Sequence, residues 1–341
     1  MGAKSIPNSK AAGAKSAKHK LAQTSIRAFS ALCRMIPVNR SKIQGPIVDK
    51  AAALRDVPLD YSFNARRAGV KWSTEAFPDI LTRHMMFEGM YQQDVLVAMK
   101  SLVRRGDTVF DIGGHHGLMA VVGAQATGPT GKVITFEPNP NSRERIRQHV
   151  ALNELHNVAV ENVAVSNCNG EATFYCQSGD VSWNSTLVEE FANAEGGEHR
   201  SINSITVKTE TLDDYVERTG YKPDVIKIDT EGSEFLALMG GKKTVAEHKP
   251  ALIVEFNPSA AESAHTSMGE YVAFLRDLGY DLKVPTRNVL GFYSFKHPED
   301  FSEKKHAKDY LTNVVCIPRD RQQQAPAAFE KVERELQPAQ A

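Results

Sequence analysis

Short apolar runs alternate with segments of helical periodicity through the middle of the chain. The runs fall at residues 108–112, 132–136, 158–160, 225–228, 251–256, 281–284 and 313–317. Such runs, bounded by turn residues, are typical of strands that are buried on both faces of a parallel sheet. The pattern predicts an α/β fold with one doubly wound, mostly parallel, Rossmann-like sheet of seven strands. No long helical segment is evident between the last two runs, which favours an antiparallel pair there.

The segments between the runs carry helix start and stop signals. Residues 118–126 are rich in small apolar side chains and predict a helix directly after a glycine-rich turn. Asn139 is placed to cap the next helix, and Pro140 suits its first position because proline lacks the N–H that a first turn leaves unused. Ser267 and Glu270 have the spacing of a capping box, which predicts another helix start.

The composition changes along the chain and suggests its organisation. Residues 1–50 hold ten Lys or Arg and one acid, Asp49. That composition is typical of a disordered arm, although a phosphate contact, a membrane-surface contact and an organelle-targeting presequence stay open. We therefore expect a basic arm (1–50), a helical approach segment that covers the substrate site (51–105), the α/β domain (106–318), an inserted β-hairpin and loop within it (162–223), and a flexible tail (319–341).

Charge and cysteine content exclude several function classes. The 41 basic and 41 acidic residues cancel to a formal net charge of zero, so no nucleic acid partner is expected. The four cysteines show no C-x-x-C spacing, which argues against a zinc framework and a disulfide scaffold. No stretch approaches the roughly 20 apolar residues that span a bilayer, so no transmembrane segment is predicted. We expect a cytoplasmic protein, with organelle targeting by the arm left open.

Acidic residues stand at the ends of four predicted strands. Asp111 ends the first, Glu137 follows the second, Asp229 follows the fourth and Glu255 lies in the fifth. In open α/β sheets the ligand binds beyond the carboxyl ends of the strands. The glycine-rich turn at 113–117 lets a ligand approach the backbone, and a carboxylate after the second strand can accept both ribose hydroxyls. These positions predict a nucleoside site.

The glycine-rich turn helps to distinguish the nucleoside. It reads Asp-Ile-Gly-Gly-His-His-Gly from Asp111, without the G-x-G-x-x-G register of a dinucleotide site. An acid before the first glycine suits a ligand that has an ammonium group and no pyrophosphate. S-adenosyl-L-methionine (SAM) has an ammonium group, a ribose and a cationic sulfonium. SAM is the predicted cofactor, and an NAD-dependent oxidoreductase is the weaker alternative.

Several motifs occur together in one order and spacing. They are residues 106–113 leading to Gly117, VITFEPNP at 133–140, NVAVS at 162–166, TLDD at 211–214, IKIDTEGSE at 226–234 and VEF at 254–256. From about residue 87 to residue 318 the sequence resembles the FkbM-type SAM-dependent methyltransferases. The resemblance implies a class I methyltransferase fold and methyl transfer, usually to an oxygen of a sugar or other small natural product. The family typically reads D-x-G-A-N-x-G, whereas Gly114 and His115 stand here. A noncatalytic SAM-binding scaffold therefore remains an alternative.

Site residues follow from these patterns. A neutral hydroxyl must lose its proton during methylation, so a general base is needed. Asp229 and Glu231, just beyond the fourth strand, are the first candidates, and His115 is a further one. Lys227 is expected to be buried and paired with a carboxylate. Cofactor binding is assigned to Asp111, Gly113, Gly114, Gly117, Glu137, Asn162 and Asp229.

The remaining expectations concern metals and partners. Adjacent histidines such as His115 and His116 should point apart unless the turn is distorted, so no metal site is assigned, and metal dependence stays open. The acceptor is expected to be a small molecule or a carbohydrate. The loop around Trp183 and Asn184 would cover it. The oligomeric state is left open.

Overall fold

The computed structural model describes residues 61–74, 80–177, 185–194, 202–287, 293–296 and 312–319, together with residues 24 and 28. The chain divides into two compact units, Met1–Tyr91 and Gln92–Ala341. Nearly all of the basic arm and the tail, and the loop residues Trp183 and Asn184, lie outside the described residues. Among the described residues, no helix has both the length and the apolar character that a membrane crossing requires.

The first unit contains a β-hairpin that the sequence analysis did not predict. Strands β1 (Tyr61–Ala65) and β2 (Val70–Thr74) pair antiparallel, with Phe63 opposite Trp72. Alternate residues of β2 are buried, and Trp72 is fully enclosed. Helix α3 (Ile80–Phe87) follows, and Trp72 Nε1 donates to Thr82 Oγ1 at 3.4 Å. The expected helical segment is thus part hairpin, because period-two burial outweighs helix propensity there.

The second unit is built on one mixed sheet, and the doubly wound, mostly parallel fold predicted from the sequence is confirmed. All seven expected strands are present, and β12 (Tyr293–Lys296) adds an eighth; their order is β12-β11-β13-β10-β9-β3-β4-β5. The seven are β3 (Thr108–Ile112), β4 (Lys132–Phe136), β5 (Val158–Glu161), β9 (Val225–Ile228), β10 (Ala251–Phe256), β11 (Tyr280–Arg287) and β13 (Thr312–Pro318). Strands β5, β4, β3, β9 and β10 run parallel, while β13 pairs antiparallel with β10 and β11, as expected for the last two predicted strands.

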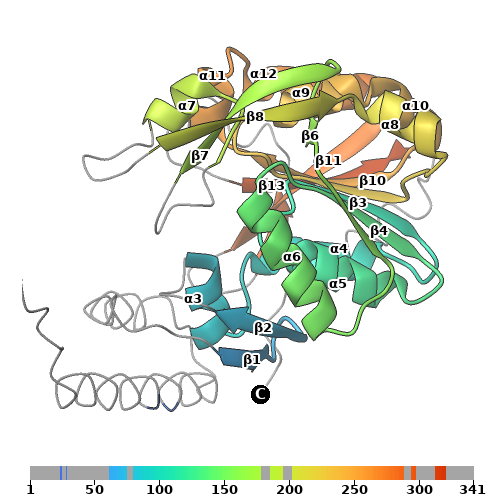
Figure 1. Ribbon diagram of the computed structural model, residues 1–341. Coiled ribbons are helices and arrows are strands. Elements are labelled where there is room, and N and C mark those ends of the chain that lie inside the picture. The colour runs from blue at the N-terminus through green and yellow to red at the C-terminus, as the bar shows by residue number, and fades with distance from the viewer. Residues whose placement is uncertain are drawn as a thin grey trace, which may run out of the picture. The chain divides into compact units, whose positions relative to one another are not determined.

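Helices cover both faces of this sheet (Figure 1). One face carries α4 (Gln93–Leu102), α5 (Leu118–Thr127) and α6 (Pro140–Leu152), and the opposite face carries α8 (Leu212–Thr219), α9 (Glu234–Gly240), α10 (Lys242–His248) and α12 (Met268–Asp277). The predicted caps are confirmed. The Asn139 side chain accepts from Asn141 N, and Ser267 and Glu270 form both bonds of a capping box. Capping fixes where α6 and α12 begin because it satisfies N–H groups that a first turn leaves open.

The predicted inserted hairpin is also confirmed. Strands β7 (Gly170–Gln177) and β8 (Ile202–Glu210) pair antiparallel, and β6 (Ala164–Val165) completes a small sheet of order β6-β8-β7. A short helix, α7 (Glu189–Ala194), lies in the loop between them and packs against α11 (Pro258–Ser263). The insertion is therefore joined to the main domain through helices as well as strands.

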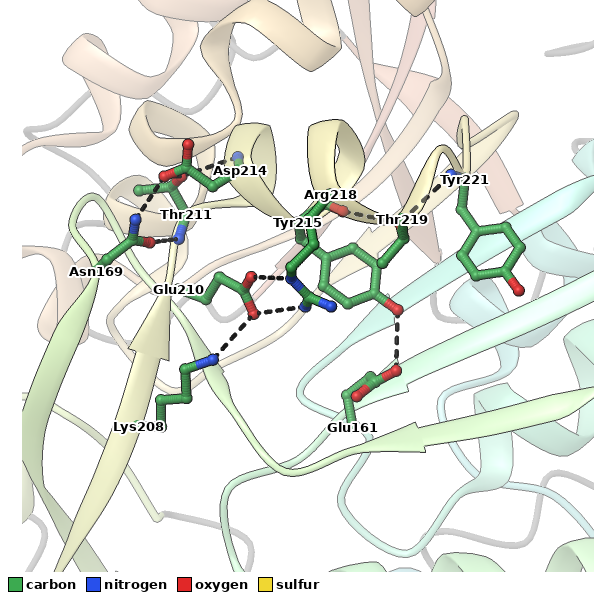
Figure 2. Close-up of polar contacts among 10 residues, drawn as sticks. All are labelled: Glu161, Asn169, Lys208, Glu210, Thr211, Asp214, Tyr215, Arg218, Thr219 and Tyr221. Atoms are coloured by element: carbon green, nitrogen blue, oxygen red, sulfur yellow. Dashed lines mark hydrogen bonds and ion pairs between the residues drawn. The ribbon is translucent and has the colours of Figure 1, made fainter.

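A polar network attaches the insertion to the main sheet (Figure 2). Arg218 on α8 donates to both carboxylate oxygens of Glu210 at the end of β8, at 2.9 and 3.0 Å. From the same helix, Tyr215 donates its hydroxyl to Glu161 Oε1 of β5 at 3.0 Å. The Tyr215 ring is buried edge-on against Phe136 of β4. Helix α8 thus connects β8 to β5 and holds the insertion beside the carboxyl ends of the parallel strands.

Candidate active site

The strand order of the main sheet reverses between β3 and β9. From β3 the chain proceeds through β4 to β5 in one direction and later through β9 to β10 in the other. In open α/β sheets such a switch point opens a crevice at the carboxyl ends of the strands, where ligands bind. The glycine-rich turn after β3 and the Asp229 loop after β9 both lie at this point. The fold therefore brings the predicted site residues to the expected edge.

Register places the polar residues in two rows on one face of the sheet. Thr135, Asp111 and Lys227 are direct partners across β4, β3 and β9. Two residues further on, where side chains return to the same face, stand Glu137, Asp229 and Glu255. The inner row contains the lysine, and the outer row at the strand ends is acidic.

Lys227 connects the two rows. Its Nζ donates to the Gly113 carbonyl oxygen at 3.0 Å and lies 3.2 Å from Asp229 Oδ2 and 3.7 Å from Asp111 Oδ1. Burial disfavours the ammonium, but the carboxylates of Asp229 and Asp111 outweigh it, and the pKa of Lys227 is raised. The prediction of a buried, carboxylate-paired lysine is confirmed.

Asp111 is the most enclosed acid of the site, with no exposed surface. Burial raises the pKa of its carboxyl, although Lys227 and a hydrogen bond from Thr135 Oγ1 at 3.1 Å lower it. Among the described residues, Asp111 Oδ1 accepts no hydrogen bond. The Lys227 ammonium lies 3.7 Å from this oxygen, which therefore keeps the capacity to accept from a further donor.

The glycine-rich turn packs against both neighbouring strands. Gly113 has φ 82°, and a Cβ there would lie 1.8 Å from Asp229 O. A Cβ at Gly114 would lie 2.1 Å from Thr135 Oγ1, so the absence of a side chain at Gly114 makes space for the threonine on β4. Gly117, also at positive φ, caps α5 and lies against Ile146 of α6. The turn needs glycine at these positions because strands and helix approach its backbone closely.

His115 and His116 take an arrangement that the sequence analysis did not predict. Their rings stack with centroids 3.8 Å apart, whereas adjacent histidines were expected to point apart. The reason is the left-handed backbone of His115, with φ 45°, which histidine and asparagine tolerate better than most residues. The buried His149 holds the turn by donating from Nδ1 to the His116 carbonyl oxygen at 2.7 Å. His115 therefore belongs to the turn, and its role as a base is untested.

Glu137 joins the turn to the end of β4. Its Oε2 accepts from His115 N at 2.7 Å, and its Oε1 accepts from Asn139 N at 2.8 Å. Burial raises its pKa to about 7, against the lowering effect of these N–H donors and of Arg143. Each carboxylate oxygen has a second lone pair, so Glu137 can still accept hydroxyl donors. Asn162 is exposed just after β5, next to Glu161, whose carbonyl accepts from Glu137 N.

The loop after β9 presents Asp229 and Glu231. Glu231 is left-handed, with φ 55°, and its carbonyl accepts from Thr186 Oγ1 at 2.6 Å. The buried Glu234 stabilises the loop by accepting hydrogen bonds from Thr230 N and Gly232 N at 2.8 and 3.1 Å. Left-handed backbone at a non-glycine residue is costly, and such contacts are what maintain it.

The N-terminal end of helix α4 lies at the same edge of the sheet. Gln92, its N-cap, donates from Nε2 to Asp229 Oδ2 at 3.4 Å, and Asn313 Nδ2 donates to Asp94 Oδ2 at 3.1 Å. Asn313 is the register partner of Glu255. The carboxylate oxygens of Asp229, Glu231 and Glu255, here named the acidic cluster, lie within 4.8 Å of one another. Burial, followed by the charges of Asp229, Glu231 and Glu234, raises the pKa of Glu255 well above its usual value.

Sequence reasoning missed the residues that support the site. It assigned no role to Thr135, Thr186, Glu234 or Gln92. The four-residue spacing of Glu234 from Thr230 is visible in the sequence. Spacing alone does not show, however, whether an acid after a strand binds a ligand or accepts hydrogen bonds from its own loop. The contacts of Thr186 and Gln92 join residues far apart in sequence, so no local signal could have found them.

The fit between Gly114 and Thr135 can be tested through stability. We expect Gly114→Ala to lower the free energy of unfolding by about 1–3 kcal/mol, because the new methyl overlaps Thr135 Oγ1. Thr135→Ala removes that oxygen, so the double variant should lose less than the sum of the two single variants. Urea unfolding of the four proteins measures this coupling. Additive losses would show that the overlap is relieved elsewhere.

Part of the chain is similar to a curated methyltransferase. It is 26% identical to the hexuronic acid methyltransferase AglP of Haloferax volcanii over 152 residues, which are 44% of this chain and 56% of that protein. The chain thus spans about half the length of the curated relative that it matches.

Solved structures give weaker likenesses. The methyltransferase FkbM of Methylobacillus flagellatus matches with a TM-score of 0.38 and 14% identity, over 70% of this chain and 55% of that chain. Aeropyrum pernix fibrillarin, solved with S-adenosyl-L-methionine, matches with a TM-score of 0.36 and 11% identity, over 65% of this chain and 73% of that chain.

A family profile extends over about half of the chain. The profile described as "Methyltransferase FkbM domain" matches residues 111–282. These residues begin at the acid of the glycine-rich turn and end in β11, so they include every strand end described above. Membership of a methyltransferase family supports S-adenosyl-L-methionine as the cofactor, in agreement with the sequence analysis. The chain belongs to the FkbM methyltransferase family.

Proposed function

We propose that this chain transfers a methyl group from SAM to an oxygen of a sugar or another small acceptor. The observation that carries the proposal is the acidic outer row, Glu137, Asp229 and Glu255, at the switch point beside the glycine-rich turn. The hexuronic acid methyltransferase named above supports a carbohydrate acceptor. The acceptor's identity, the O-methyl specificity and the roles below are parts of the proposal.

The residues present fit this cofactor. Asp111, with a buried oxygen that accepts no hydrogen bond among the described residues, stands next to the turn and suits an ammonium group. Glu137 keeps acceptor capacity for two ribose hydroxyls, and Asn162 stands beside it at the end of β5. When bound, SAM supplies a methyl group whose transfer to oxygen leaves the bonding electron pair on sulfur. Gly113, Gly114 and Gly117 let the turn pack closely against β4, α6 and the loop after β9, and we assign the backbone of this turn to the cofactor.

The chain's own contribution to chemistry is to position the acceptor and to accept its proton. A hydroxyl that gains a methyl group must give up its proton to a base. Glu231 lies in the loop after β9 with a left-handed backbone. The hydrogen bond from Thr186 to its carbonyl and the one from Gly232 N to Glu234 fix this loop. Asp229 is engaged by Lys227 and Gln92 through Oδ2. We therefore assign the role of general base, which accepts the proton of the acceptor hydroxyl, to Glu231. We assign a positioning role near the cofactor to Asp229.

Glu137 makes cofactor binding depend on pH. Its carboxyl has a pKa of about 7, and ribose hydroxyls donate best to its ionised form. Affinity for S-adenosylhomocysteine should rise about tenfold from pH 6 to pH 8, because the ionised fraction rises from about a tenth to about nine tenths. Calorimetry on the wild-type chain and on Glu137→Gln measures this. The variant should bind more weakly and without that pH dependence, and an equal slope in both proteins would remove Glu137 from the ribose site.

The two acids after β9 can be separated by paired measurements. Glu231→Gln should keep its affinity for S-adenosylhomocysteine while methyl transfer falls about a hundredfold or more, because Glu231 is assigned to the acceptor and not to the cofactor. Asp229→Asn should weaken cofactor binding as well, since it loosens the contact with Lys227. The assay is single-turnover transfer of radiolabelled methyl from SAM to glucuronic and galacturonic acids and their glycosides. Full transfer by Glu231→Gln would move the base to Asp229, Glu255 or His115.

A further inference from the structure

Three carboxylates gather around one point beyond β9 and β10. Oxygens of Asp229, Glu231 and Glu255 lie within 4.8 Å of one another, and they come from a strand end, a loop and a neighbouring strand. Acidic residues often gather without binding anything. A binding site requires more than proximity of acids.

Glu255 is a buried acid with one unpartnered carboxylate oxygen. Its side chain is 2% exposed, and its Oε2 has no hydrogen-bond partner among the described residues. Buried carboxylate oxygens in proteins are nearly always hydrogen-bonded or bound to a cation, because water is lost without replacement otherwise. The same carboxyl group has an oxygen within 4.8 Å of carboxylate oxygens of Asp229 and Glu231. That environment suits a positive charge.

Lys227 does not meet this requirement alone. Its Nζ is already engaged by Asp111, Asp229 and Gly113 O, and the contacts that Asp229 makes with Lys227 and Gln92 both go to Oδ2. Glu234 is occupied by the N–H groups of Thr230 and Gly232. The acidic cluster thus lies beside one ammonium, which contacts Asp229 of the cluster but is shared with Asp111 and Gly113 O.

We propose that the acidic cluster binds one divalent cation of the hard, oxygen-preferring class, such as Mg²⁺, Mn²⁺ or Ca²⁺, with Asp229, Glu231 and Glu255 as ligands. Such ions bind carboxylate oxygens at about 2.1 Å for Mg²⁺ and about 2.3–2.6 Å for Ca²⁺. Two oxygens that share one ion are then at most about 4.2 Å apart for Mg²⁺ and about 4.6–5.2 Å apart for Ca²⁺. The oxygens of the cluster lie within 4.8 Å of one another. A site with three protein ligands leaves coordination positions for water or for an acceptor oxygen.

The role of the cation in binding the acceptor rests on the proposed function. Cation binding itself does not depend on that function. A hexuronic acid is an anion at neutral pH, and three neighbouring carboxylates would repel it. A divalent cation reverses that repulsion and can hold an oxygen of the acceptor beside Glu231. The ligands would then recognise a hydroxyl or carboxylate oxygen of a sugar through the metal.

Cation binding can be measured without any turnover. The full chain is stripped with EDTA and titrated with Mn²⁺, and free Mn²⁺ is followed by its electron paramagnetic resonance signal. We expect one Mn²⁺ per chain, displaced by Mg²⁺ or Ca²⁺, with affinity at least about tenfold weaker in Glu255→Gln and in Glu231→Gln. Glu247→Gln, which changes an exposed glutamate on α10, is the matched control and should bind as the wild type does.

The possible results separate this proposal from the methyltransferase assignment. Circular dichroism checks the fold of each variant, and Glu231→Gln, on a partly exposed loop, carries the test if Glu255→Gln does not fold. No Mn²⁺ binding at millimolar concentration, or equal binding in all four proteins, would overturn the metal site. Calorimetry with S-adenosylhomocysteine on the same samples tests the cofactor separately. Cofactor binding without Mn²⁺ binding leaves the proposed function standing, and the reverse result leaves only the metal site.

Discussion

The buried ammonium of Lys227 is the contact on which the rest of the site depends. It is the point where β3, β9 and the glycine-rich turn are held together, because one Nζ reaches Asp111, Asp229 and Gly113 O. Without a cation there, the fully buried Asp111 and the partly buried Asp229 would face each other uncompensated, which is strongly unfavourable. The lysine thereby stabilises one acid of the inner row and one acid of the outer row.

The acidic outer row links the fold to its chemistry. Parallel strands bring their carboxyl ends to one edge, and the switch point between β3 and β9 opens that edge. Glu137 and Glu255 lie at its two ends, and burial raises the pKa of both. An edge of this kind favours cationic ligands, as the proposals for SAM and for a divalent cation both require.

Sequence patterns predicted the framework better than the supporting contacts. The strands, the caps at Asn139 and Ser267 and the partner of Lys227 all follow from local periodicity and spacing, so they were found. The β1–β2 hairpin was missed because its burial depends on α3, and the His115–His116 stack was missed because a left-handed residue reverses the expected direction. The Thr135, Thr186 and Gln92 contacts depend on distant strands and loops, which no local pattern reveals.

The central role of Lys227 is tested most directly by the free energy of unfolding of Lys227→Met as a function of pH. Methionine keeps the length of the side chain and removes its charge, so the variant should lose about 3–5 kcal/mol at pH 8, where Asp111 and Asp229 are left without a cation. The loss should shrink toward pH 5, because burial raises the pKa of the Asp111 carboxyl, which can then take up a proton. A small loss that does not change with pH would show that the lysine only fills space and would contradict this account.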